Sequence, residues 1–139
     1  MAESRKKLTL FHRVFGICAT KGPQDPECWN YTDGQIEIEL ERAPELTPEN
    51  GAVRLEGKSL PEQVLVFRDN DGGFRALHNK CTHGGRRIDP LPGTHTVQCC
   101  SVGKSVFDYE GKPVSGSAKE PVKVYEAVEV DNKLVVKIT

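Results

Sequence analysis

Two short segments of the chain place cysteine and histidine at spacings that metal centres use. The first is Cys81-Thr82-His83 and the second begins with Cys99-Cys100, with sixteen residues between His83 and Cys100. Side chains two apart in an extended segment share one face, so Cys81 and His83 can serve neighbouring metal atoms. Thiolate and imidazole groups are ligands of zinc and of the irons in [2Fe–2S] clusters. These residues therefore predict a metal centre.

The second segment lacks a histidine that would complete a four-ligand set. A Cys-x-x-His pair starting at Cys100 would end at Gly103, and one starting at Cys99 would end at Val102. Three outcomes follow from this gap. A substitute residue supplies the ligand, the position stays open to solvent or a small molecule, or no cluster is bound and only the fold persists.

Three further thiols are candidates for the substitute ligand. Cys99 is adjacent to Cys100, but neighbouring side chains of a strand point to opposite faces, so only a bent backbone brings both sulfurs to one site. Cys18 and Cys28 reach the site only if the N-terminal part of the chain folds over it. We take Cys81, His83, Cys100 and Cys99 as the candidate ligand residues, and the sequence leaves the fourth ligand open among Cys99, Cys28, Cys18 and solvent.

Short strands separated by turns must position these residues. Ile36, Ile38 and Leu40 alternate with glutamates, which is typical of a strand with one buried face. No long helical pattern interrupts the series, and turn signals such as residues 70–73 recur at short spacing. The pattern predicts an all-β, antiparallel sandwich or small barrel, with both cysteine segments in loops at one end. Further strands are expected at residues 52–56, 64–67, 74–77, 94–100, 105–108, 122–130 and 134–138.

The first 34 residues differ from the rest of the chain. Residues 8–18 fit a helical stripe and a strand equally well, and the sequence does not decide between them. A breaker-rich loop follows at residues 21–26. We therefore expect an N-terminal extension at residues 1–34, which contains Cys18 and Cys28, and one domain at residues 35–139.

Length and composition narrow the class of protein. A chain of 139 residues with a net charge of −1 and a pI near 6.4 is typical of a single domain without a nucleic-acid partner. No apolar run approaches the length of a membrane span, and His12 and Arg13 interrupt the only stretch like a signal peptide, so we expect a cytoplasmic protein. Five cysteines, an odd number, indicate metal binding more than a disulfide framework.

Residues 35–139 resemble a Rieske domain. Cys-Thr-His in this setting and Phe107-Asp108 at a fixed distance from Cys100 carry the resemblance. It implies stacked antiparallel sheets, with a small cluster-binding subdomain formed by two loops at one end. Ser105 falls where respiratory Rieske proteins have a serine that hydrogen-bonds to the cluster. The other matching features are Gly57, residues 64–67, Asp71-Gly72, residues 76–83, Gly111-Lys112-Pro113 and the hairpin at residues 128–138.

The resemblance implies a small soluble electron carrier of the Rieske ferredoxin type rather than a stand-alone enzyme. Such a carrier holds a [2Fe–2S] cluster and passes single electrons to an oxygenase or reductase partner. Cys81 and Cys100 would bind one iron and His83 the other. Two alternatives stay open because of Gly103. One is a Rieske-like small subunit without a cluster, which acts by binding a protein partner. The other is a zinc- or iron-binding module.

Overall fold

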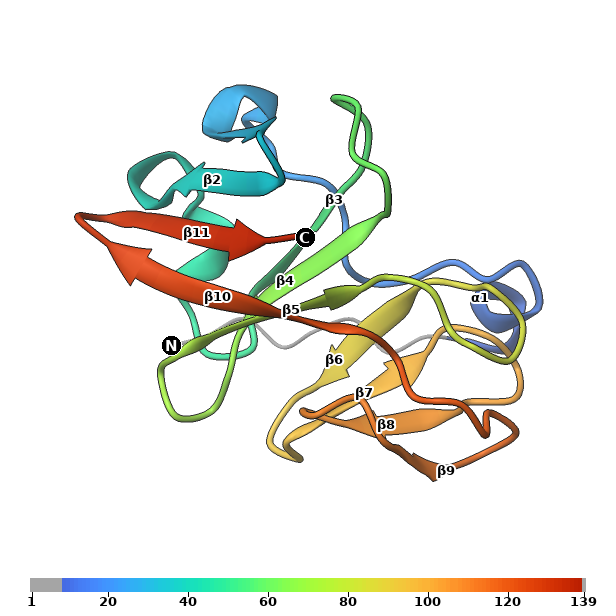
Figure 1. Ribbon diagram of the computed structural model, residues 1–139. Helices are drawn as coiled ribbons and strands as arrows, with labels where there is room; N and C mark the ends of the chain where they lie inside the picture. The colour runs from blue at the N-terminus through green and yellow to red at the C-terminus, as the bar shows by residue number, and fades with distance from the viewer. Residues whose placement is uncertain (1–8, 139) are drawn as a thin grey trace.

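The computed structural model describes residues 9–138, which form two antiparallel β-sheets (Figure 1). The larger sheet has seven strands in the order β1-β2-β11-β10-β5-β4-β3, and we call it the main sheet. The smaller has four strands in the order β6-β7-β8-β9, and we call it the small sheet. The main-sheet strands are β1 (Trp29–Thr32), β2 (Gln35–Glu39), β3 (Ala52–Leu55), β4 (Val64–Arg68), β5 (Phe74–His78), β10 (Val124–Val130) and β11 (Lys133–Lys137). The small-sheet strands are β6 (Ile88–Leu91), β7 (Thr96–Cys99), β8 (Val106–Asp108) and β9 (Pro113–Ser115).

Strand β4 separates two hydrophobic cores. Its side chains alternate between its faces, as the period of a strand requires. Val64 and Val66 pack into the core inside the main sheet, while Leu65 and Phe67 pack into the core between β4 and the small sheet. All four side chains are fully buried, which explains why this strand is apolar at every position instead of at every second one.

The structure confirms the predicted all-β class with a small subdomain at one end. Each strand expected from the sequence is present within two residues of its predicted bounds. Strand β6 falls inside residues 81–92, which we expected to be a stiff loop because the stretch is rich in glycine and proline, Pro90 included. The small sheet places β6 at its edge, where a proline that donates no hydrogen bond is tolerated. Strands β1 and β9 were also missed, since each is short.

The N-terminal part of the chain begins with a short helix, α1 (Leu10–Val14), which resolves the choice between helix and strand for this stretch. Thr9 caps its N-terminus and accepts a hydrogen bond from the His12 backbone N–H. Three 3₁₀ turns follow later, at Pro26–Cys28, Leu40–Arg42 and Pro44–Leu46. Strand β1 then pairs with β2, so the main sheet begins before residue 35.

No helix within residues 9–138 has the length and apolar character needed to cross a membrane.

Candidate metal centre

The two predicted ligand segments lie side by side at one end of the small sheet. The first cysteine loop, residues 81–87, joins β5 to β6, and the second cysteine loop, residues 100–105, joins β7 to β8. Backbone hydrogen bonds tie each loop in place. The Cys81 N–H donates to the Arg86 carbonyl at 2.7 Å, which closes the first loop, and the Cys100 N–H donates to the Arg87 carbonyl at 3.0 Å, which links the two. The sheet thus brings together cysteines that are far apart in sequence.

Cys81 and Cys99 form a pair of free, buried thiols. Each residue is only 1% exposed, and both belong to the buried core between β4 and the small sheet. Cys99 Sγ also lies 3.1 Å from Ser101 Oγ. Burial raises the pKa of the Cys99 thiol and the neighbouring Cys81 adds to this rise, while the contact with Ser101 opposes it. Metal binding to thiols in such a core would release their protons.

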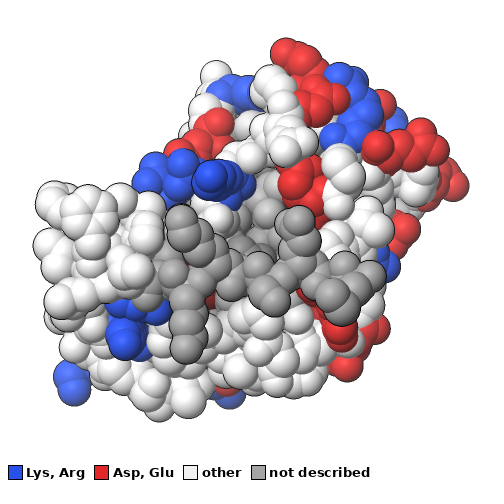
Figure 2. Space-filling view, turned by 180° about the vertical axis from the view of Figure 1, so that it is seen from behind, with Lys and Arg blue, Asp and Glu red and all other residues white. Residues whose placement is uncertain are grey.

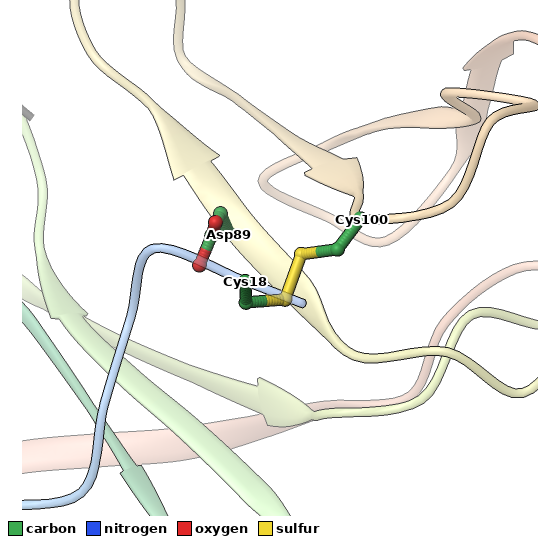
Figure 3. A group of neighbouring side chains, drawn as sticks. All are labelled: Cys18, Asp89 and Cys100. Carbon is green, nitrogen blue, oxygen red and sulfur yellow. A yellow bond between two sulfur atoms is a disulfide. The ribbon is translucent and has the colours of Figure 1, made fainter. Parts of the chain in front are cut away.

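Cys100 forms a disulfide with Cys18 in this structure (Figure 3). The two Cα atoms are 5.4 Å apart, although 82 residues separate them in sequence. Cys100, a predicted ligand, therefore does not present a thiolate in this state. Of the N-terminal thiols, Cys18 reaches the site and Cys28 does not, because Cys28 is buried in the core of the main sheet. Burial there raises the pKa of the Cys28 thiol.

His83 and Gly103 differ from the buried thiols in being exposed to solvent. Among the described residues, no hydrogen bond or metal-ligand group joins His83 to a cysteine. A Cβ atom built on Gly103 would meet only the hydroxyls of Ser101 and Ser117, each at 3.7 Å, which is an ordinary contact. The fold therefore leaves room for a side chain at position 103, and the loss of a histidine there is not imposed by packing.

Asp89 holds the N-terminal part of the chain against the small sheet. Its two carboxylate oxygens accept hydrogen bonds from the backbone N–H groups of Ala19 at 2.7 Å and Thr20 at 2.9 Å. One of these oxygens and the sulfurs of Cys18 and Cys100 lie within 4.8 Å of one another (Figure 3). Our reading of the sequence missed Asp89. The available signal was an acidic residue between the apolar Ile88 and Pro90.

Two arginines fasten the same part of the chain to both cysteine loops. Arg13 donates hydrogen bonds to the carbonyl oxygens of Cys99 at 3.2 Å and Ser101 at 3.3 Å. Arg86 donates to the Phe15 carbonyl at 2.8 Å and packs so closely over Gly16 that a Cβ there would lie 2.4 Å from its guanidinium. Gly16 has a φ of 67°, so glycine fits the position for two reasons. Residues 9–20, the N-terminal segment, thus cover the site.

The N-terminal segment is apolar on its outer side. Leu10, Phe11, Val14, Phe15 and Ile17 are each more than 40% exposed. Figure 2 shows one face of the molecule on which Asp and Glu side chains gather mainly toward the main sheet, whereas the opposite side is largely uncharged, with scattered Lys and Arg. The charge distribution at the site end therefore differs from that of the rest of this face.

Ser105 is buried, and its hydroxyl accepts a hydrogen bond from the Ala118 N–H at 3.0 Å. A Cβ on Gly116 would come within 2.5 Å of the Ser105 Cα. Ser105 therefore ties the second cysteine loop to the segment that follows β9. Its role toward a cluster, which the resemblance implies by position, stays a prediction.

The sequence of residues 39–126 matches the family model of the Rieske [2Fe–2S] domain. This chain is a Rieske domain. The match covers well over half of the chain, and it includes both cysteine loops but not Cys18. Family membership implies a [2Fe–2S] cluster, since this is the cofactor for which the family is named.

Relatives of this Rieske domain include carriers and parts of oxygenases. It is 33% identical over 86 residues to the oxygenase subunit of tert-butanol monooxygenase / tert-amyl alcohol desaturase from Aquincola tertiaricarbonis, and the match covers 60% of this chain and 17% of that protein. The chain therefore spans a small part of that relative's length.

Solved structures share the fold. The ferredoxin of carbazole 1,9a-dioxygenase from Nocardioides aromaticivorans IC177 aligns with a TM-score of 0.57 and 20% identity, over 66% of this chain and 88% of that one. The plasma-membrane Rieske protein PetC3 from Synechocystis PCC 6803 aligns with a TM-score of 0.52 and 23% identity, over 63% of this chain and 86% of that one. At these identities, the alignments show a common architecture.

The side-chain types in the two cysteine segments suit a [2Fe–2S] cluster, because thiolates and imidazoles are the ligands that such clusters use. Cys81, Cys99 and Cys100 would offer three sulfurs, from the two loops and the end of β7, and His83 would offer an imidazole. The set contains more sulfur than the usual one of two thiolates and two imidazoles. In this structure Cys100 is not available as a ligand, because its sulfur is bonded to Cys18.

Proposed function

We propose that this Rieske domain is an electron-transfer protein that holds a [2Fe–2S] cluster through Cys81, Cys99, Cys100 and His83. The cluster would supply reversible uptake of single electrons. The observation that carries the proposal is that Cys81 and Cys99 are free thiols buried in one core, at the end of the small sheet where the two cysteine loops meet.

The apolar residues around the thiols determine how far water reaches the proposed site. Ile88, Val97 and Phe107 belong to the same buried core as Cys81 and Cys99, and they exclude water from the sulfur side of the site. The exposed His83 supplies the opposite side, where a partner can approach. A short path for electrons would therefore lead out through the first cysteine loop, while the core protects the thiolates.

An oxygenase or reductase is the partner that we propose. One solved relative is the complex of reduced oxygenase and oxidised ferredoxin in carbazole 1,9a-dioxygenase, in which the alignment covers 86% of the matched chain at 21% identity and a TM-score of 0.55. A carrier that serves such an enzyme makes a small, transient contact. We propose the cytoplasm as the location. Three of the five cysteines are free thiols, and a disulfide in that compartment, such as Cys18–Cys100, is usually transient or redox-sensing.

Metal analysis tests the proposal. The protein purified without oxygen should carry about two irons and two acid-labile sulfides per chain, and should show the EPR signal of a reduced [2Fe–2S] centre. Cys81→Ser or Cys99→Ser should each lose most of the iron, while Cys28→Ser, which changes a buried thiol outside the site, should keep it. A colourless wild-type protein without iron that nevertheless folds would refute a cluster-based function.

A second candidate function is supported by Gly103 and by the disulfide at Cys100. Both features remove a ligand, and a Rieske fold without a cluster would act as a protein-binding subunit. Zinc is a weaker alternative, because family membership favours iron and sulfide. Normal folding together with the absence of both iron and zinc would support the binding subunit over the carrier.

A further inference from the structure

Cys18 is the one cysteine at the site that lies outside the region matching the Rieske family, yet it is covalently bonded to a proposed ligand. We propose that Cys18 and Cys100 form a thiol–disulfide switch that controls whether the metal centre can be loaded. When the bond is present, Cys100 is withheld and the site is one donor short. When it is reduced, Cys100 joins Cys81 and Cys99. This inference rests on the proposed cluster.

The structure holds the two sulfurs where a dithiol can reduce the bond and where the reverse exchange, with the cyclic disulfide of that reagent as the oxidant, can form it again. Asp89 fixes the backbone just after Cys18 by accepting from the N–H groups of Ala19 and Thr20. Arg13 fixes the other end of the N-terminal segment on the carbonyl oxygens of Cys99 and Ser101. After reduction these ties keep the Cys18 thiol beside Cys100, so the effective concentration of one thiol at the other stays high.

The exposure of the two cysteines sets the order of the exchange steps. Cys18 is 8% exposed and Cys100 is fully buried, so an external dithiol meets Cys18 first. Its thiolate bonds to Cys18 Sγ, and the Cys18–Cys100 bond breaks with the electron pair left on Cys100 Sγ, which then takes a proton. The second thiol of the reductant releases Cys18. The protein gains two electrons and two protons, and the dithiol loses them as it becomes a cyclic disulfide.

The role that we assign to Cys18 differs from that of a ligand. A ligand stabilises the bound metal, so its removal lowers loading. A residue that withholds another ligand has the opposite effect, because its removal frees Cys100 under all redox conditions. Substitution of Cys18 therefore separates the two roles by the direction of the change.

The experiment compares iron loading in chains of known thiol state. Metal-free wild type is prepared oxidised, or reduced with dithiothreitol and then desalted, and Cys18→Ser is prepared without a reductant. Each receives ferrous iron and stoichiometric sulfide without oxygen, and thiols are counted in denaturant before and after. Oxidised wild type should show three free thiols and load roughly tenfold less iron and sulfide than reduced wild type or Cys18→Ser. Cys28→Ser serves as the matched control and should respond to dithiothreitol as wild type does.

Each other outcome has a definite meaning. Equal loading of oxidised and reduced wild type, with the disulfide still present, overturns the switch and leaves the proposed function standing. Loss of loading in Cys18→Ser alone makes Cys18 a ligand and also overturns the switch. Failure of both reduced wild type and Cys18→Ser to load removes the proposed function, and the switch falls with it. If Cys18→Ser does not fold, as judged by circular dichroism, the two wild-type states still decide.

Discussion

Arg13 and Cys99 are 86 residues apart in sequence, yet the Arg13 guanidinium donates a hydrogen bond of 3.2 Å to the Cys99 carbonyl oxygen. The same side chain reaches the Gln98 Oε1 at 2.9 Å and the Ser101 carbonyl at 3.3 Å. One residue of α1 thus connects the N-terminal segment to the end of β7 and the start of the second cysteine loop. This connection places the disulfide partner over the site.

Arg13→Met should loosen the N-terminal segment. The substitution removes the charged donor of three hydrogen bonds, to two backbone carbonyl oxygens and one side-chain amide oxygen. Because these acceptors lose their partner, we expect the free energy of unfolding to fall by about 1–2 kcal/mol. Urea unfolding and limited proteolysis of the N-terminal segment measure the effect. Lys119→Met, which also removes an exposed cation, is the control. Equal proteolysis of Arg13→Met and wild type would show that Arg13 does not hold the segment.

Gly103→His should restore a second imidazole. The nearest atoms to a Cβ at this position are hydroxyls at 3.7 Å, so the backbone need not move. Imidazole ligands raise the reduction potential of a cluster relative to thiolate ligands. In protein whose Cys18–Cys100 disulfide is reduced and whose cluster is bound, we expect Gly103→His to raise this potential by on the order of 100 mV. Wild type should have the lower potential, closer to that of all-thiolate clusters. A redox titration followed by EPR gives both values, and an unchanged potential would mean that position 103 does not face the metal.

Lys104→Gly should stabilise the second cysteine loop. Lys104 has a φ of 50°, a left-handed conformation that is costly for residues with a Cβ. Since glycine adopts it without a clash, we expect a gain of roughly 0.5–1 kcal/mol in the free energy of unfolding. Lys112→Gly is the matched control, because Lys112 is an exposed turn lysine with an ordinary φ, and there glycine should lower stability. A loss of stability in Lys104→Gly would contradict the argument.

Asp69 should make the free energy of unfolding depend on pH in the acidic range. Burial raises the pKa of its carboxyl, but hydrogen bonds from Arg75 and from the Asp71 and Gly73 N–H groups outweigh burial and lower the pKa below its ordinary 3.8. The group therefore binds a proton more weakly when folded. The contribution of Asp69 to the free energy of unfolding is complete above about pH 4. It is lost as the pH falls through the lowered pKa that the group has in the folded state.

Asp69→Asn tests this dependence. We expect the variant to be less stable than wild type by on the order of 1 kcal/mol at neutral pH, because the amide cannot replace the ion pair with Arg75. The difference should shrink as the pH approaches 3. Urea unfolding of both proteins at several pH values measures it, with Asp71→Asn as a nearby exposed control. Parallel pH profiles of Asp69→Asn and wild type would rule out Asp69 as the source.

The sequence was enough to predict the strands whose residues alternate or whose turns are marked. Ile36 and Ile38 in β2 and the turn after Asp69 are such cases. The sequence did not reveal β6, which contains Pro90. A proline fits a strand only at the edge of a sheet, and whether a strand lies at an edge depends on which strands pair with it in the fold. Local pattern carries no information about that choice.

The candidate site was predicted only in part for a similar reason. Cys81 and Cys100 stand in two short loops and Cys99 ends β7, and the sequence already placed both segments at one end of the sheets. The disulfide between Cys18 and Cys100 depends on a tertiary contact across 82 residues, held by Asp89 and Arg13. Five cysteines allow many pairings, and only the path of the N-terminal segment selects this one.

Strand β4 limits how this protein can be divided or recombined. Val64 and Val66 pack into one core while Leu65 and Phe67 pack into the other, so both cores depend on this strand of the main sheet. A chimera that transplants only the small sheet and its cysteine loops would leave one wall of their core open to water. A transferable electron-transfer module from this chain therefore has to include β4 and the strands that hold it.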